Sequence, residues 1–262
     1  MRSAVENDNA SVPACGIAVM AKASVARRTK TRLVPPLTFD QAAQCNTAFL
    51  RDIAENILTA SAEASIAGYI AYDPPDARRF FEENVPPEIA LIEASYPSLG
   101  HCLDQALAQL LERGHRAAVV VNSDSPTLPT SLLVETAELL GRPGERVVLG
   151  PAIDGGYYLL GVKARHRRLL EDIAWSTERV AQQTLERAAE LHLPVHVLPT
   201  WYDVDDIATF RILLSELFEG QPFAPPLSPA RAHHTRALIQ SLLEMPDLKD
   251  HLVHNTFRRA AE

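Results

Sequence analysis

The sequence predicts an α/β fold in which helices cover both faces of a doubly wound, mostly parallel sheet. Short apolar runs alternate with longer segments whose apolar residues recur at helical spacing. The run at residues 117–121 is unbroken, rich in Val and too short for a helix, as in a strand buried on both faces. Two further runs, residues 146–150 and 157–162, follow one another without an intervening helix. We therefore expect an antiparallel member in a mixed sheet.

The remaining elements follow from the same patterns. The capping-box pattern of Thr38 and Gln41 opens a helix, and Gly114 is suited to end another. We expect Ser176 to cap a helix, and a proline-rich linker at 222–229 to precede the last ones. Strands are expected at 16–20, 66–72, 90–93, 117–121, 146–150, 157–162 and 195–198, and helices at 38–60, 78–84, 99–113, 130–140, 177–191, 207–218, 229–244 and 247–259.

Composition indicates a globular protein and excludes some function classes. The 262 residues suffice for one large domain or two small ones, with 47% hydrophobic and 22% charged residues. A formal net charge of −8 argues against a nucleic-acid partner, which requires a basic footprint. No apolar run reaches the length of a membrane span, so we expect no membrane partner.

The amino-terminal segment and the cysteines predict a cytoplasmic location. Residues 1–14 lack the apolar core of a secretory signal and have the composition of a disordered tail. Cys15, Cys45 and Cys102 are far apart and form no CxxC motif. This spacing argues for a reducing compartment and against a disulfide framework or a zinc site.

A polar segment, NSDSP at residues 122–126, follows the central predicted strand. Ligands of open α/β sheets bind just beyond the carboxyl ends of the strands. Asp124 is therefore well placed to hold a divalent cation against a phosphate. The alternative is an ordinary turn, since Asn, Asp, Ser and Pro are all turn residues.

The loop after the first predicted strand, residues 21–33, carries five cations and no acid: Lys22, Arg27, Arg28, Lys30 and Arg32. Five like charges repel one another unless an anion lies among them, and nucleotide phosphates would supply it. The position after a first strand is also where phosphate loops of α/β folds occur. A solvated basic loop is the alternative.

Two acidic motifs follow later in the chain. Asp154, Gly155 and Gly156 form a turn in which the glycines permit close approach of a ligand, and Asp154 is able to grip a hydroxyl or an amine. A plain turn is the alternative. Three acids at 203, 205 and 206 crowd one strand-to-helix corner; one is expected as a helix cap, and a second cation ligand is plausible among the others.

The four histidines of the carboxyl-terminal tail carry no predicted metal site. His233 and His234 are adjacent, so they are expected to point to different helix faces, and His251 and His254 form an HxxH pattern without an acid. We expect this tail to pack on the domain or on a partner subunit of a homodimer. The predicted organisation is a tail at 1–14, one domain at 15–220, and a linker with a helical extension at 221–262.

Five segments in order carry a family resemblance: MAKASVARRTKTRLVPPLT, VVNSDSPTLP, LGPAIDGGYYLLGVK, EDIAWSTERVAQQTLERA and WYDVDD. Over roughly residues 16 to 217 the chain resembles nucleotide-dependent transferases once catalogued as a domain of unknown function, often labelled arsenosugar-biosynthesis-type glycosyltransferases. Their superfamily is the nucleotide-diphospho-sugar transferases of GT-A fold. The KTRL segment also resembles that of 2-phospho-lactate guanylyltransferases, which share this fold.

The resemblance implies roles for individual residues. Lys22, Lys30 and Arg32 would face nucleotide phosphates, and Asp124 and Asp205 would hold Mg²⁺ or Mn²⁺. Arg27 joins the phosphate-binding candidates for a different reason: it lies among these cations, where a shared anion would balance its charge. Asp154, Gly155 and Gly156 would form the acceptor or sugar side, which makes Asp124 and Asp154 the candidate catalytic residues. The chain departs from the family at Ala26 and Arg27, where relatives commonly have Pro-Gly. Arg adopts positive φ less readily than Gly, so this departure bears on nucleotide affinity.

The resulting hypothesis is a metal-dependent transferase with a nucleotide or nucleotide-sugar and a small-molecule acceptor as its partners. Displacement at an anomeric carbon, which is glycosyl transfer, ranks narrowly above displacement at phosphorus, which is nucleotidyl transfer to a phosphorylated acceptor. Both reactions leave a charged nucleotide diphosphate or pyrophosphate that cations must stabilise. A non-catalytic nucleotide-binding protein is the remaining alternative.

Overall fold

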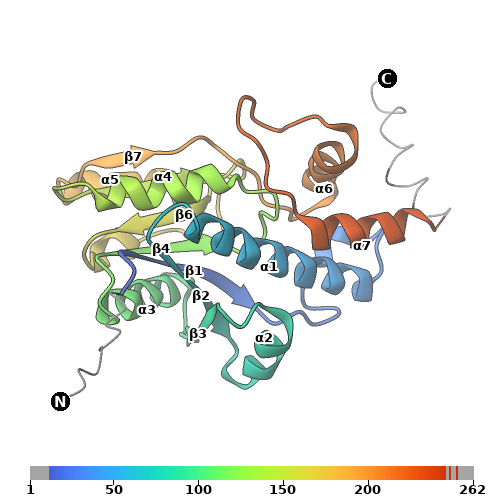
Figure 1. The fold of residues 1–262 in the computed structure, drawn as a ribbon, viewed down its shortest axis with the longest axis horizontal. Helices are drawn as coiled ribbons and strands as arrows, with labels where there is room; N and C mark the ends of the chain where they lie inside the picture. Colours follow the sequence, from blue (N-terminus) through green and yellow to red (C-terminus); the bar gives the residue numbers. More distant parts are fainter. Residues whose placement is uncertain (1–11, 246–247, 249–251, 253–262) are drawn as a thin grey trace, which may run out of the picture.

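Seven strands form one mixed sheet at the centre of the protein, whose structure, a computed structural model, describes residues 12–245, 248 and 252. Their order across the sheet is β3-β2-β1-β4-β6-β5-β7, with β6 antiparallel to its neighbours β4 and β5 (Figure 1). The predicted α/β class and its antiparallel member are confirmed. The strands are β1 (Cys15–Lys22), β2 (Ile66–Asp73), β3 (Ala90–Glu93), β4 (Ala117–Asn122), β5 (Val147–Pro151), β6 (Tyr157–Val162) and β7 (Val195–Val197).

Helices cover both faces of this sheet because successive strand residues point to opposite sides. Ile17 and Val19 of β1 pack in the core beneath α1, α4, α6 and α7, whereas Ala18 packs on the other face against α3 and α5. The helices are α1 (Phe39–Ser61), α2 (Arg78–Asn84), α3 (Leu99–Glu112), α4 (Thr130–Gly141), α5 (Val180–Glu190), α6 (Ile207–Leu214) and α7 (His233–Leu243). None of these described helices is both long and apolar enough to cross a bilayer.

Among the described strands, the six that are mutually parallel, which are all except β6, end at one edge of the sheet. Lys22 ends β1 opposite Asp73 of β2, and Asn122 ends β4 beside Met20. Strands β2 and β3 lie on one side of β1, whereas β4 and all later strands lie on the other side. Ligands of α/β sheets bind beyond the strand ends at the point where the strand order reverses, which here is between β1 and β4. The polar segments singled out in the sequence therefore converge on this edge.

Several predicted boundaries are confirmed and two are wrong. Thr38 and Gln41 form the predicted capping box, and Gly114 has a φ of 94°. Ser176, however, does not cap α5, which begins at Val180 after Arg179. The side chain of Gln183 accepts a hydrogen bond from the Ala174 backbone N–H (2.8 Å), and this contact keeps the preceding segment in a loop.

The last described helix, α7, begins at His233 and not at the predicted residue 229. The Ala230 backbone N–H donates to the carbonyl oxygen of Thr127 (3.0 Å), which holds the preceding segment against the loop after β4. Helix α6 is followed by a π-helical turn, Ser215–Glu219, that ends at Gly220. The predicted tail at 1–14 and helix at 247–259 lie largely outside the described residues.

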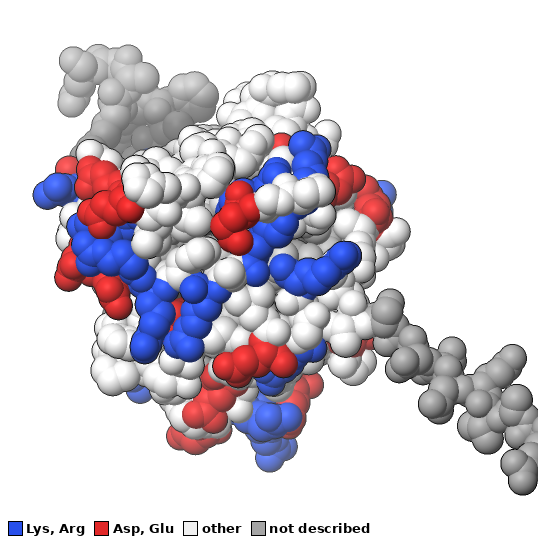
Figure 2. Space-filling model, turned by 90° about the vertical axis from the view of Figure 1, so that its left-hand side faces the viewer, with Lys and Arg blue, Asp and Glu red and all other residues white. Residues whose placement is uncertain are grey.

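The surface at the end of the molecule shown in Figure 2 mixes both signs of charge. Lys and Arg side chains lie among Asp and Glu side chains, and the described residues of this face form no continuous basic stripe.

Cys15, Cys45 and Cys102 are all free thiols, as expected from their spacing.

Asp206 resolves one ambiguity of the acidic corner, because it is the N-cap of α6. Its carboxylate accepts the Thr209 backbone N–H (2.9 Å), which completes a capping box. We predict that Asp206→Ala lowers the free energy of unfolding by about 1 kcal/mol, measured by urea denaturation. Asp206→Asn keeps an acceptor oxygen and should lose less; equal losses for the two variants would contradict the capping role.

Candidate functional site

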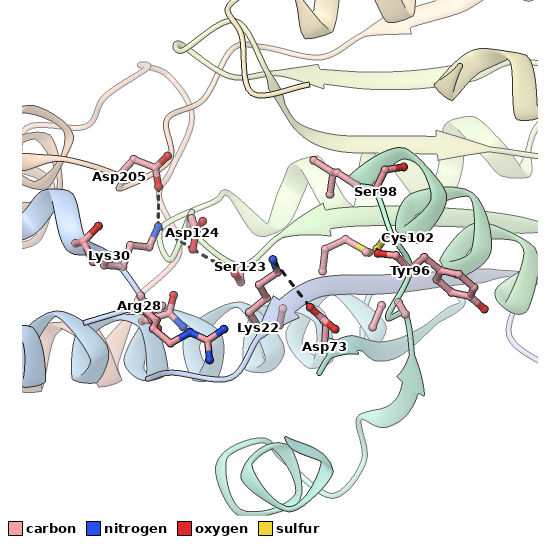
Figure 3. A pocket seen from close by; sticks show the side chains of 18 of the residues that line it. Lys22, Arg28, Lys30, Asp73, Tyr96, Ser98, Cys102, Ser123, Asp124 and Asp205 are labelled. Atoms are coloured by element: carbon pink, nitrogen blue, oxygen red, sulfur yellow. Dashed lines mark hydrogen bonds and ion pairs between the residues drawn. The ribbon is translucent and has the colours of Figure 1, made fainter. Parts of the chain in front are cut away.

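Two adjoining cavities lie along the carboxyl edge of the sheet and form one groove. The first, of about 500 Å³, lies beneath the basic loop (Figure 3). The second, of about 450 Å³, lies beside the turn between β5 and β6. Met20, Arg32, Leu99 and Asp205 line both cavities, so the groove is continuous.

Lys30 occupies the junction between the two candidate metal ligands. Its ammonium lies 2.9 Å from Asp124 Oδ1 and 2.8 Å from Asp205 Oδ1, and its side chain is only 5% exposed (Figure 3). Burial alone would lower the pKa of Lys30, but the charges of Asp124 and Asp205 outweigh burial and raise it. Lys30 therefore carries a fixed positive charge between two acids from distant parts of the chain.

The two acids are held at this distance by the backbone that carries them. The Val204 backbone N–H donates to the carbonyl oxygen of Asp124 (2.8 Å), and Ser125 Oγ donates to the carbonyl oxygen of Tyr202 (2.8 Å). The Tyr202 hydroxyl also bonds Thr127 (2.9 Å) and donates to buried Glu216 (2.6 Å). These buried polar contacts join the loop after β4 to the acidic corner.

The acidic side chains offer two arrangements for a divalent cation. A cation held by Asp124 and Asp205 needs Lys30 to move, because the ammonium fills the space between them. Oxygens of Asp154, Asp203 and Asp205 lie within 4.8 Å of one another and leave Lys30 in place. Carboxylate oxygens are the donors that Mg²⁺ and Mn²⁺ prefer, so the donor chemistry fits in either case. Asp205 is common to both arrangements.

Asp203 is a site residue that sequence reasoning did not select. Burial, and then the neighbouring charges of Asp154, Asp205 and Asp124, raise its pKa to about 7. Burial disfavours the charged form of this carboxyl group, and the three nearby acids disfavour it further. The sequence signal was the crowding of acids at the corner, which did not show which of them lies beside Asp154.

The structure separates the cations of the basic loop into two groups. Lys22, Arg28, Lys30 and Arg32 line the first cavity. Arg27 does not line it: its side chain is exposed, and its guanidinium lies 5.1 Å from the centre of the Phe39 ring. Its φ is 68°, the left-handed conformation that glycine adopts more easily. The geometry thus gives no support to Arg27 as a phosphate ligand and brings in Arg28, which we did not select.

The turn between β5 and β6 contributes Asp154 and Gly156 to the second cavity, whereas Gly155 does not line it. Gly155 has a φ of 88°, and a Cβ there would lie 2.1 Å from the Glu178 carbonyl oxygen. Its own carbonyl accepts the Ala181 backbone N–H (2.9 Å). Gly155 therefore lets the turn pack against the start of α5, which is a structural role.

The second cavity also contains aromatic and polar groups that the sequence did not identify. Tyr157 and Trp175 pack edge to face with ring centroids 6.5 Å apart. The Tyr157 hydroxyl and Asn122 Oδ1 are buried and have no hydrogen-bond partner among the described residues. Burial raises the pKa of the Tyr157 phenol, so it remains protonated.

Comparisons with known proteins support the predicted relationship. A family described as "Uncharacterized protein conserved in bacteria (DUF2064)" matches residues 56–177, which include Asp124 and Asp154 but neither Lys30 nor Asp205. A solved structure from Desulfovibrio desulfuricans G20, provisionally assigned as a nucleotide-diphospho-sugar transferase, is 26% identical, with a TM-score of 0.71, and the match covers 87% of this chain and 97% of that chain.

A cytidylyltransferase from Leptospira borgpetersenii serovar Hardjo-bovis (strain JB197) shares the fold at 13% identity and a TM-score of 0.50; the match covers 90% of this chain and 96% of that chain. No curated protein matches the sequence. The resemblance to the DUF2064 family and the nucleotide-diphospho-sugar transferase fold is confirmed.

The raised pKa of Asp203 predicts a pH-dependent stability. The folded protein retains this proton up to about pH 7, whereas the unfolded chain releases it near 3.8. Between these values the folded state binds more protons, so the free energy of unfolding contributed by Asp203 falls as pH rises. Asp203→Asn cannot ionise and should therefore gain about 1–2 kcal/mol relative to wild type between about pH 5 and pH 8, after allowing for solvent screening. Urea denaturation with a chelator present measures it; parallel pH profiles would show that Asp203 titrates normally.

Proposed function

We propose that the protein is a nucleotide-dependent transferase that works with Mg²⁺ or Mn²⁺ and moves a sugar from a nucleotide-sugar to a small acceptor. The observation that carries the proposal is the junction of Lys30 with Asp124 and Asp205, where a cationic cavity meets an acidic one. The relative from Desulfovibrio desulfuricans supports it, because its sequence is similar as well as its fold.

The first cavity suits the nucleotide. Its rim carries Lys22, Arg28 and Arg32, whose charges complement phosphates; guanidinium groups in addition offer two parallel donors to one phosphate. The opposite wall, at residues 94–99, is less charged and includes Tyr96, which is 43% exposed. An exposed aromatic ring there provides a flat surface for a base.

A divalent cation bound at the acids would neutralise charge on the departing nucleoside diphosphate. Lys30 would stabilise the same charge from the protein side. Its ammonium lines the first cavity, where it would donate a hydrogen bond to a phosphate oxygen in place of one of its two carboxylates. Asp205 lines both cavities, so it is in position to hold the cation between nucleotide and acceptor.

The charge of the second cavity favours glycosyl transfer over transfer to a phosphorylated acceptor. Its lining includes Asp154, Glu178 and Asp205 but only one cation, Arg32. Such a cavity repels a phosphate, whereas carboxylates accept hydrogen bonds from sugar hydroxyls. Tyr157 and Trp175 add apolar surface for the carbon–hydrogen face of a sugar ring.

Product analysis tests the proposed reaction. The protein is incubated with nucleotide-sugars and with nucleoside triphosphates, each with Mg²⁺ or Mn²⁺ and a panel of acceptors. Release of nucleoside diphosphate from nucleotide-sugars is expected. Release of pyrophosphate from triphosphates would identify a nucleotidyltransferase instead, and neither product across the panel would favour a nucleotide-binding protein without transferase activity.

Arg27 and Arg28 form a matched pair for testing nucleotide recognition. Arg28 lines the first cavity, and Arg27 lies over Phe39 outside it. Arg28→Ala should weaken nucleotide binding by about 1.5–3 kcal/mol, the usual contribution of a charge-assisted hydrogen bond, and Arg27→Ala should leave it nearly unchanged. Calorimetric titration of both variants measures this; the reverse pattern would indicate that Arg27, and not Arg28, contacts the phosphates.

Substitution of Lys30 tests which acids receive the cation. If Asp124 and Asp205 are the ligands, Lys30→Met removes a competing ammonium and should raise Mn²⁺ affinity roughly tenfold or more, since a bond of about 1.5 kcal/mol no longer has to be broken. Lys22→Met is the control, because its ammonium is exposed and lies 4.0 Å from Asp73. Asp124→Asn distinguishes the two arrangements, because Asp205 belongs to both: loss of Mn²⁺ binding would support Asp124 and Asp205, and unchanged binding would support Asp154, Asp203 and Asp205.

A further inference from the structure

A second cluster of metal-ligating side chains lies where α7 packs along α1 (Figure 1). Helix α7 contributes His233 and His234 from its first turn, and α1 contributes Asp52 and Glu55. Ligand atoms of Asp52, His233 and His234 lie within 4.8 Å of one another. None of the four residues lines either cavity of the groove.

The two imidazoles converge on one carboxylate. His234 Nε2 lies 2.7 Å from Glu55 Oε1, and His233 Nε2 lies 3.2 Å from Glu55 Oε2. The ring centroids of the two histidines are 4.1 Å apart. The expectation that adjacent histidines point apart is therefore wrong here, because both side chains reach the same acid on α1.

Asp52 fixes the position of these histidines. Its carboxylate is buried and accepts the backbone N–H groups of His234 (2.9 Å) and Thr235 (2.8 Å), so it caps α7. His233 Nδ1 lies 4.0 Å from Asp52 Oδ1. This capping contact explains why Asp52 is buried and how α7 packs on α1. It does not explain why two imidazoles contact Glu55.

A cluster with both imidazole nitrogens and carboxylate oxygens favours a different metal ion than the groove, where the candidate ligands are all carboxylates. A tetrahedral Zn²⁺ with ligands at about 2.0–2.1 Å separates them by about 3.3 Å, and the two imidazole Nε2 atoms lie 2.7 and 3.2 Å from the Glu55 carboxylate, close to that value. Imidazole suits Zn²⁺ and similar transition ions, whereas Mg²⁺ prefers oxygen alone. The His233 side chain is 61% exposed, which leaves an entry path for an ion.

We propose that His233, His234 and Glu55, supported by Asp52, form a second metal site that takes Zn²⁺ or a similar transition ion and fastens α7 to α1. The ion replaces the hydrogen bonds between imidazole and carboxylate. Ile239 and Leu242 of α7 belong to the same core as α1, so the site reinforces a packing contact that already exists. This site is independent of the transferase function proposed for the groove.

Titration of the full chain with Zn²⁺ and Co²⁺ tests the site, with excess Mg²⁺ present to occupy oxygen-only sites. We expect one ion per chain by calorimetry, visible Co²⁺ absorption of a nitrogen-containing site of low coordination number, and a rise in the melting temperature. His234→Gln should weaken binding at least roughly tenfold. His196→Gln is the matched control, because His196 also lies near a glutamate, Glu135 (3.4 Å), without a second imidazole.

Wild-type Co²⁺ affinity in the variant with both His233→Gln and His234→Gln would overturn the proposal. Complete displacement of Co²⁺ by Mg²⁺ from the wild-type protein would do the same. If the double variant does not fold, the wild-type Co²⁺ spectrum decides, since a weak spectrum typical of six oxygen ligands excludes imidazole coordination.

Discussion

One buried ammonium holds two carboxylates from distant parts of the chain together at the centre of the groove. Lys30 joins Asp124, which follows β4, to Asp205, which precedes α6, and without it these acids would repel one another across the junction. The contact lies where the two cavities meet, because Asp205 lines both of them. A bound divalent cation would balance the carboxylates, and a substrate phosphate would balance Lys30. Ligand binding would therefore replace the contacts between Lys30 and the acids with contacts to the ligands.

The fold was largely predictable from the sequence because its signals are local and repeated. The unbroken Val-rich run of β4 and the Thr38 capping box each specify an element without reference to distant residues. The start of α5 was not predictable in the same way. Gln183 reaches back to Ala174 and competes with the capping signal at Ser176, and this contact exists only after the helix has formed.

The region of the candidate site was predictable from the sequence, but its individual residues were less so. Asp124, Lys30 and Asp154 stand out because loops after strands of an α/β sheet converge at one edge. The choice between Arg27 and Arg28, or among the acids at 203, 205 and 206, depends on the side to which each side chain turns. In a loop, side-chain directions do not alternate or repeat at a fixed spacing as they do in strands and helices. The left-handed backbone of Arg27 and Lys30 changes these directions further. The cluster of the two histidines of α7 was not predicted for a related reason, since the glutamate that both contact is on another helix.

The hydrogen bond from Ala230 to Thr127 has a consequence for how the chain divides. Thr127 belongs to the loop that carries Asp124, and its hydroxyl bonds Tyr202 beside the acidic corner. The segment after residue 220 looks like an appendage in the sequence, but it braces the loop at the centre of the groove and sends α7 into the common core. A substitution between residues 221 and 243 is therefore able to displace the loop that carries Asp124, although it lies outside both cavities.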